Sequence, residues 1–252
     1  GFTDWDLVRR AKPLFKSHRQ PKVPADLGYY DLNDRSVILR QRSLAKRFGI
    51  DGFCVWHYWF SGKTPLHRPI EEIFTDDDNE MKICMGWANE CWTRVWRGRE
   101  EDVLLPMEYE QEGDILNHLK YLMRFFEKPK YLRIDGRPVL IIYRPELLPE
   151  AENYLEKYQK CIRDFGFKGI FFVGVFNPFL STSKRGFDAY TYQTPSFSPR
   201  FRAYSMKDNL SSRLIKKILK HWNSLRGPRY VRFHEFSEYW NQLPVEEDTF
   251  YF

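Results

Sequence analysis

Apolar residues along this chain fall into two alternating patterns. Short continuous apolar runs have the length of buried strands, and longer stretches repeat an apolar residue every three or four positions, as one face of a helix does. We predict strands over 50–60, 81–90, 139–145, 169–177 and 189–193, and helices over 36–49, 114–128, 150–165 and 210–225. Strands separated by helices or long loops, without hairpin turns, predict a parallel sheet, either open and doubly wound or closed into a barrel.

Polar and aromatic side chains follow each predicted strand. They are His57, Tyr58 and Trp59, then Asn89 and Glu90, then Tyr143 and Arg144, then Asn177, and finally Gln193. No glycine fingerprint for a dinucleotide and no P-loop follows any strand, which disfavours a nucleotide-cofactor fold. Functional groups at the carboxyl ends of several strands are typical of a (β/α)8 barrel. Five strands are too few to close one, so we predict an incomplete TIM-type barrel whose first and last strands lie outside this chain.

The segment 86–98, GWANECWTRVWRG, is the densest candidate site. It holds three of the eight tryptophans, Trp87, Trp92 and Trp96. Such indoles can form a platform on which the apolar faces of sugar rings stack. Glu90 is the candidate for acid or base catalysis, because burial among indoles raises the pKa of a carboxyl group. The alternative is a structural ion pair between Glu90 and Arg94.

Two further groups at strand ends have alternative roles. His57 could contact a ligand or could be a hydrogen-bonded core residue. Arg144 could bind a substrate anion in bidentate fashion or pair with Glu90 across the site. We predict Glu90 as the catalytic residue and the following residues as substrate-binding: His57, Tyr58, Trp59, Trp87, Asn89, Trp92, Arg94, Tyr143 and Arg144.

Composition limits the class of protein. The chain has 252 residues, enough for a large core, and no internal repeat or long linker divides it, which predicts one domain over 1–252. Its longest apolar run, 169–176, is far below the roughly 18 residues of a membrane span. The four cysteines form no CxxC pair and have no histidine at zinc-ligand spacing. We therefore predict reduced thiols, a cytoplasmic location, no metal and no cofactor.

Positive charge is concentrated in one part of the chain. The net charge is +6, but residues 200–232 contain ten Lys or Arg and a single acidic residue, Asp208. Within it, 211–222 reads as a basic amphipathic helix, which could lie peripherally on an anionic membrane or could be an outer barrel helix with a solvated face. Charges in 80–110 are balanced, which disfavours nucleic acid as the partner of the indole cluster.

Several segments together resemble the WbsX-type family, also described as glycoside hydrolase family 99-like. They run in order from Gly1 to about Asp188, and are GFTDWDLVRRAKPLF, LGYYDL, FGIDGF, HYWF, WANECWTRVWRG, YLRIDGRPVLIIYRP and GFDA. The resemblance implies a TIM-barrel protein that acts on glycosidic bonds, as a glycosyltransferase or an endo-glycosidase, in the synthesis of bacterial cell-surface polysaccharides such as O-antigen or capsule. Members of family 99 proper are retaining endo-acting mannosidases.

The chain departs from the family pattern in ways that bear on the mechanism. Cys91 and Arg97 stand where the family more usually has Asn and Asp. The NEWxE motif, whose two carboxylates match the catalytic pair of family 99, is not in these residues, and NECW at 89–92 belongs to a different motif. Glu90 could therefore bind a sugar hydroxyl beside a catalytic pair supplied by other strands. The alternative function is a non-catalytic glycan-binding barrel or an inactive truncated homologue.

Overall fold

The computed structural model describes residues 3–14, 16–75, 81–94, 99–109, 113–176 and 183–191. The chain divides into two units, one of residues 1–37 and 194–246 and the other of residues 38–193 and 247–252, and each is described by itself. The predicted helix over 210–225, and with it the segment 211–222, lies outside the described residues. So do Trp96, Asn177 and Gln193.

Helix α1 (Asp4–Arg10) is the regular element of the first unit's described part. The Asp6 carboxylate accepts a hydrogen bond of 3.0 Å from the backbone N–H of Thr3, which stabilises the first turn. The indole N–H of Trp5 donates to the backbone oxygen of Tyr30 at 2.8 Å, and its ring meets Tyr29 edge-on. The sequence pattern did not predict this helix.

The second unit contains a parallel sheet whose strands follow one another in chain order. Its five parallel strands are β1 (Gly52–His57), β2 (Lys82–Trp87), β6 (Arg137–Ile142), β7 (Phe171–Val175) and β8 (Ala189–Thr191). Every neighbouring pair is parallel, and the order never reverses. A doubly wound sheet reverses its strand order at a switch point, whereas a barrel does not. The strand order therefore favours the barrel-type arrangement of the two that the sequence left open.

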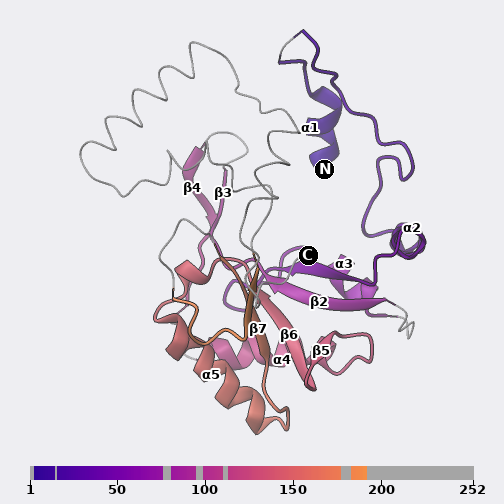
Figure 1. The fold of residues 1–252 in the computed structure, drawn as a ribbon. Helices are drawn as coiled ribbons and strands as arrows, with labels where there is room; N and C mark the ends of the chain where they lie inside the picture. The colour runs from indigo at the N-terminus through magenta and orange to yellow at the C-terminus, as the bar shows by residue number, and fades with distance from the viewer. Residues whose placement is uncertain are drawn as a thin grey trace, which may run out of the picture. The chain divides into compact units, whose positions relative to one another are not determined.

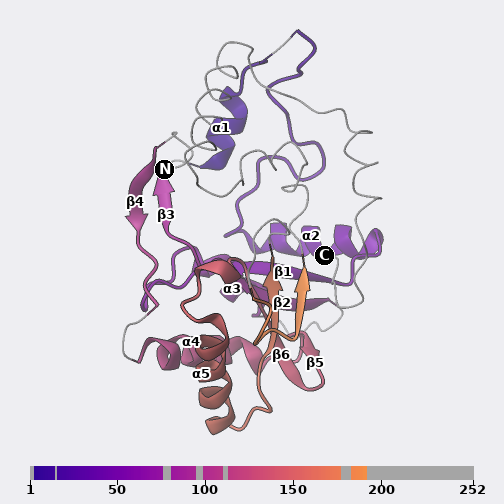
Figure 2. The ribbon, with the colours of Figure 1, turned by 60° about the vertical axis from the view of Figure 1, so that its left-hand side comes forward.

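Four described helices accompany the parallel strands. They are α2 (Arg35–Arg47), α3 (His67–Ile73), α4 (Asp114–Phe126) and α5 (Ala151–Asp164). Helix α2 precedes β1, and α3, α4 and α5 lie between later strands. The helices predicted over 36–49, 114–128 and 150–165 are confirmed as α2, α4 and α5, whereas α3 was not predicted. Helices α4 and α5 lie side by side against one face of the sheet (Figure 1 and Figure 2). On α4, Leu119, Leu122 and Phe126 recur at helical spacing and are fully buried, and Ile115 is partly buried. No described helix is long and apolar enough to cross a membrane.

The prediction of a sheet without hairpins is wrong in two places. Strand β5 (Arg133–Ile134) pairs antiparallel with β6 through Asp135 and Gly136, which both have positive φ, as a two-residue hairpin turn requires. Strands β3 (Trp92–Arg94) and β4 (Arg99–Leu105) form an antiparallel ribbon after β2 that extends away from the parallel sheet (Figure 1). A short 3-10 helix, η2 (Pro145–Leu147), follows β6.

Of the cysteines in β1 and β2, Cys84 lies in the core and Cys54 is partly buried against it. Cys54 faces Cys84 across the two strands, and Cys84 is buried. A hydrogen bond with Cys84 and burial together raise the pKa of the Cys54 thiol well above its usual range. A thiol kept protonated in this way is a weak nucleophile, so the pair acts as packing.

Candidate functional site

The carboxyl ends of β1, β2 and β6 bring most of the predicted residues together. Strand pairing aligns His57 with Trp87, and Trp87 with Ile142. Because consecutive residues of a strand point to opposite faces, this row lies on one face of the sheet, and the row of Trp56 and Gly86 lies on the other. The first face is covered by α4 and α5.

On the helix-covered face, two histidines and a tyrosine form a buried hydrogen-bonded chain. His57 Nε2 lies 2.7 Å from His118 Nε2, and His118 Nδ1 lies 2.8 Å from the Tyr158 hydroxyl. Burial lowers the pKa of His57 to about 3, and burial and the neighbouring His57 lower that of His118 well below its usual range. Both imidazoles are therefore neutral near pH 7, and one ring donates the shared proton to the other.

Two of the predicted indoles pack around this chain. Trp87 has 1% of its surface exposed and meets His118 edge-on at 4.8 Å, and its Nε1 has no hydrogen-bond partner among the described residues. Trp59 stacks on His118 and donates its N–H to the Asp114 carboxylate at 3.0 and 3.1 Å. The structure thus places His57, Trp59 and Trp87 in the core, where no ring face is open to a sugar.

The opposite face of the sheet, called the uncovered face because it lies away from α4 and α5, is buried at Cys84 and Ile141 but carries a partly exposed aromatic pair at its carboxyl end. Trp56 has 40% of its surface exposed, and its ring meets Tyr143 edge-on at 4.9 Å. A Cβ added at Gly86 would lie 2.8 Å from the Trp56 ring and 3.1 Å from Cys54 Sγ, too close for any side chain. The glycine leaves room for the indole to lie across β2, and this fixes the ring beside Tyr143.

A charged cluster lies next to this aromatic pair. Arg144 Nη1 is 3.8 Å from Glu90 Oε2, and Arg144 Nε is 2.8 Å from Glu146 Oε1, although no described acceptor meets this N–H with hydrogen-bond geometry. Both the Glu90 and the Arg144 side chains are 41% exposed. Burial raises the pKa of Glu90, Arg144 opposes this, and the nearby Glu146 raises it again. Glu90 is thus a partly exposed carboxyl that takes up a proton more readily than a free one.

Asn89 joins two of the strand ends. Its side chain is completely buried, and it accepts a hydrogen bond from the Arg144 backbone N–H at 2.8 Å and donates one to the Arg144 carbonyl at 2.9 Å. Tyr109, which follows β4, donates its hydroxyl to the Asn89 carbonyl at 2.6 Å. The Asn89 side chain therefore links the ends of β2 and β6 and is not exposed at the candidate site.

The remaining predicted residues belong to the β3–β4 ribbon and its base. Trp92 meets Tyr58 edge-on at 4.9 Å and Phe60 at 5.7 Å. Arg94 lies 3.9 Å from Asp102 across the ribbon, and its predicted alternative partner, Glu90, is paired with Arg144. Both Tyr58 and Trp92 are partly exposed. Trp92 packs at the base of the ribbon, whereas the Arg94 side chain forms an ion pair with Asp102 of β4.

Sequence reasoning missed four residues that shape this site. They are Trp56, Tyr109, His118 and Glu146. Strand alternation predicts that Trp56 and His57 face opposite ways, but it does not say which of the two is exposed. Tyr109 and His118 contact residues in distant segments of the chain, so no local sequence pattern indicates their roles. The described residues contain no cluster of three or more His, Cys, Asp or Glu arranged to hold a metal ion.

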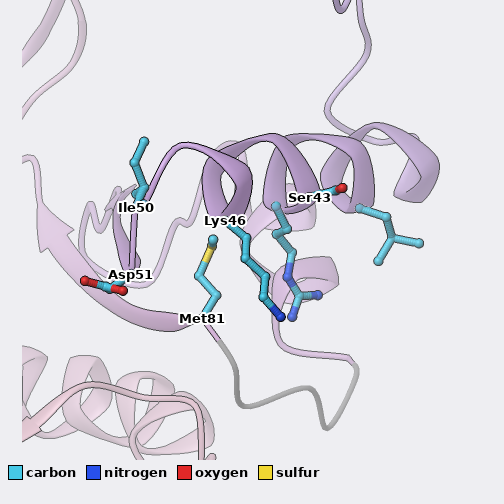
Figure 3. Close-up of a pocket in the computed structure, with 8 residues that line it drawn as sticks. Ser43, Lys46, Ile50, Asp51 and Met81 are labelled. Atoms are coloured by element: carbon cyan, nitrogen blue, oxygen red, sulfur yellow. The ribbon is translucent and has the colours of Figure 1, made fainter.

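A groove of about 380 Å³ lies at the other end of the strands (Figure 3). Helix α2 contributes Ser43 and Lys46 to its lining, and Asp51 and Met81 come directly before β1 and β2. Parallel α/β proteins build their sites at the carboxyl ends of the strands. The groove is therefore separate from the aromatic and charged cluster.

The fold and site define an α/β protein with a parallel sheet and a polar, aromatic site at the carboxyl ends of its strands. The family model described as Glycosyltransferase WbsX matches residues 1–251. The chain belongs to this family, which confirms the resemblance found in the sequence.

Curated relatives and solved structures extend this comparison. The chain is 42% identical over 166 residues to the proteins called "Uncharacterized protein WxcX" from two strains of Xanthomonas campestris pv. campestris, B100 and ATCC 33913. The match covers 66% of this chain and 24% of each relative, so the chain spans about a quarter of the length of the curated relatives it matches.

Two solved structures resemble the fold at low sequence identity. A structure titled "Glycoside hydrolase-like protein" is 14% identical, with a TM-score of 0.51 over 85% of this chain and 68% of that one. The GH99 endo-alpha-mannosidase from Bacteroides thetaiotaomicron is 15% identical, with a TM-score of 0.48 over 80% of this chain and 53% of that one. The first of these shows a shared fold.

Proposed function

We propose that this chain forms part of a carbohydrate-active enzyme that binds a glycan at the carboxyl ends of β1, β2 and β6 and acts on glycosidic bonds. The observation that carries the proposal is the pair of exposed Trp56 and partly exposed Tyr143, next in the chain to Arg144, which pairs with the carboxyl group of Glu90. Aromatic faces suit the apolar faces of sugar rings, and carboxylates accept hydrogen bonds from sugar hydroxyls. Membership of the WbsX family supports the same class of substrate.

The fold proposed for the complete protein is a (β/α)8 barrel. Its described strands succeed one another in chain order, and neither the outer edge of β1 nor that of β8 has a described partner. A closed barrel pairs both edges, so the remaining strands would come from residues outside the described part. The fold shared with the glycoside hydrolase-like structure is in keeping with this arrangement.

Within this site each side chain has a proposed role. Trp56 and Tyr143 hold the sugar ring, and Arg144 keeps Glu90 in place. Glu90 contacts the reacting sugar, where its raised pKa suits it to share or donate a proton. Glycoside chemistry usually takes two carboxyl groups, so a second one must complete the site. Glu146 shares Arg144 with Glu90, but its ion pair makes it less available as the second catalytic carboxyl group.

The proposed substrate is a bacterial cell-surface polysaccharide or its precursor, which is what the sequence resemblance implies, and the glycosyltransferase description of the family supports a saccharide substrate. All four cysteines are free thiols, which supports action on the cytoplasmic side of the membrane. The basic segment 211–222 would give peripheral contact with that membrane.

A second candidate is a barrel that binds glycans without acting on them. The observation in its favour is that Arg144 pairs with both described carboxylates of the cluster, as it would in a site built to hold a ligand. The two functions differ in one measurable respect, because only the enzyme releases or transfers sugar.

Glycan-array binding followed by product analysis tests both. The protein should retain neutral or acidic bacterial polysaccharide fragments, and Glu90→Gln should lower affinity or turnover at least tenfold. A matched control is Glu156→Gln, which removes the same charge from an exposed position on α5. Binding without turnover would favour the second candidate. Unchanged binding and turnover in Glu90→Gln would remove Glu90 from the site.

A further inference from the structure

The ends of β2 and β6 are joined by a side chain where the strand ladder stops. The last ladder bond brings Tyr143 N to the Trp87 carbonyl at 3.1 Å. Beyond it, the Asn89 amide takes the place of a strand backbone, since it accepts from the Arg144 N–H and donates to the Arg144 carbonyl. Amide groups that pair twice in this way hold a fixed distance and direction. The next residues outward, Glu90 and the Arg144 side chain, are the charged pair of the proposed site.

One hydroxyl group fixes Asn89 in turn. Tyr109 donates to the Asn89 carbonyl at 2.6 Å, and the Asn89 Nδ2 donates to the Tyr109 oxygen at 3.1 Å. The Tyr109 ring packs edge-on against Trp87 at 6.0 Å and against Tyr154 at 5.8 Å. Its position is thus set by the core on one side, and its hydroxyl is shared with Asn89 on the other. No other described group bonds the Asn89 carbonyl.

We propose that Tyr109 is a positioning residue, which acts through Asn89 to set the separation of Glu90 and Arg144 in the glycan site. The inference rests on the proposed function and adds to it a residue that does not touch the glycan. It also gives the β3–β4 ribbon a role, because Tyr109 lies between strand β4 of that ribbon and helix α4.

Loss of the Tyr109 hydroxyl group would first change the end of β2 and then the charged pair of Glu90 and Arg144. The buried Asn89 carbonyl would lose its hydrogen bond, and a buried acceptor without a partner is costly, so the end of β2 would shift toward other donors or water. Glu90 would then become more exposed and more distant from Arg144. Burial is the larger influence on the Glu90 carboxyl, so its pKa would fall toward the usual value despite the weaker effect of Arg144.

The test compares Tyr109→Phe with Tyr154→Phe in the complete protein. Both remove one hydroxyl group from neighbouring tyrosines, but the Tyr154 hydroxyl lies beside Tyr158 and bonds no described group at the end of β2. The readouts are the pKa of Glu90 from carboxyl ¹³C NMR, with Glu90→Gln to assign the signal, the glycan affinity, and the melting temperature. We expect Tyr109→Phe alone to lower the Glu90 pKa and to weaken glycan binding about tenfold.

Two results would overturn the proposal. One is a Tyr109→Phe variant that melts at a lower temperature but keeps the wild-type Glu90 titration and affinity, since its role would then be purely structural. The other is equal behaviour of the two phenylalanine variants in all three measurements. If the wild-type protein bound no glycan, the proposed function would fail, and the Glu90 titration would still decide whether Tyr109 positions this carboxyl.

Discussion

Trp56 and His57 are neighbours in the chain but lie in opposite surroundings. The indole of Trp56 is 40% exposed on the uncovered face of the sheet, whereas the imidazole of His57 is completely buried under α4. Their aligned partners on β2 differ in the same sense, since Gly86 makes room for one ring and Trp87 fills the core beside the other. The strand pleat thus separates a candidate binding surface from a hydrogen-bonded core within a single residue step.

This contrast shows that aromatic density alone does not define a sugar site. On the covered face, Trp59 bonds Asp114, and His57, His118 and Tyr158 form a continuous chain. His57 Nδ1 and Trp87 Nε1 have no described partner, but both rings are buried. On the uncovered face, Trp56 is exposed and Tyr143 is partly exposed. Variants of the two faces should therefore separate effects on stability from effects on binding.

The largest expected effect is on stability, from Trp87→Ala. Removal of a fully buried indole leaves a cavity and should lower the free energy of unfolding by about 3 to 5 kcal/mol. Denaturant unfolding followed by circular dichroism would measure it. Trp87→Phe is the control, because it keeps most of the volume and removes an N–H that lacks a described partner. A loss below about 1 kcal/mol in Trp87→Ala would show that the core closes around the gap.

The next effect is the pH dependence of stability that the two buried histidines impose. Their pKa values are lower in the folded protein than the usual 6.5, and that of His57 is about 3. At a pH between the folded and unfolded pKa values of an imidazole, the unfolded chain binds more protons than the folded chain. The stabilising contribution of each ring is therefore complete above about pH 6.5 and is lost as the pH drops. The loss is up to about 1.4 kcal/mol per pH unit for each imidazole.

Unfolding measured at pH 7, 6 and 5 would test this. His57→Gln should reduce the slope by the contribution of one imidazole, and His118→Gln should do the same. A slope unchanged in either variant would contradict the assignment of buried neutral rings to His57 and His118.

Apolar periodicity predicted the parts of the fold that depend on local burial. The strands over 50–60 and 139–145 and the helix over 114–128 appear with ends shifted by a few residues, because their apolar residues do pack as the spacing indicates. The β5–β6 hairpin was readable too, since Asp135 and Gly136 form a strong two-residue turn signal.

Other features were not readable because they depend on distant segments. The face to which His57 points is decided by His118, which lies 61 residues further along the chain. Arg144 pairs with Glu90, which was one of the two roles considered for it, and also with its near neighbour Glu146. Arg94, by contrast, lies near Asp102 because of the β3–β4 ribbon, which the apolar pattern did not predict. The sequence could name the residues at the strand ends, but tertiary packing assigns them to core or surface.

A smaller effect is expected on binding, from Trp56→Ala. The variant should weaken glycan affinity about tenfold, since stacking on an aromatic ring contributes about 1 kcal/mol or somewhat more. Its free energy of unfolding should change far less than that of Trp87→Ala, because the ring is exposed. Isothermal titration with a bound glycan would measure the affinity, with Trp56→Tyr as the conservative control. Equal affinity in Trp56→Ala and the wild type would move the sugar site away from this face.

The smallest effect is on the titration of Glu90, from Glu146→Gln. The negative charge of Glu146 raises the Glu90 pKa directly. Glu146 also pairs with Arg144, the residue whose positive charge lowers the Glu90 pKa. Neutralising Glu146 therefore lowers the Glu90 pKa by both routes, whereas Arg144→Met raises it. The shifts are modest because these side chains are partly exposed and screened by solvent.

The pH midpoint of glycan binding, or the carboxyl NMR signal of Glu90, should therefore move to lower pH in Glu146→Gln and to higher pH in Arg144→Met. Opposite shifts in the two variants would establish that Arg144 and Glu146 tune the carboxyl group on the uncovered face. Shifts of the same sign would mean that the charged cluster rearranges when either partner is removed, and the contrast with the fixed network under α4 would then be sharper still.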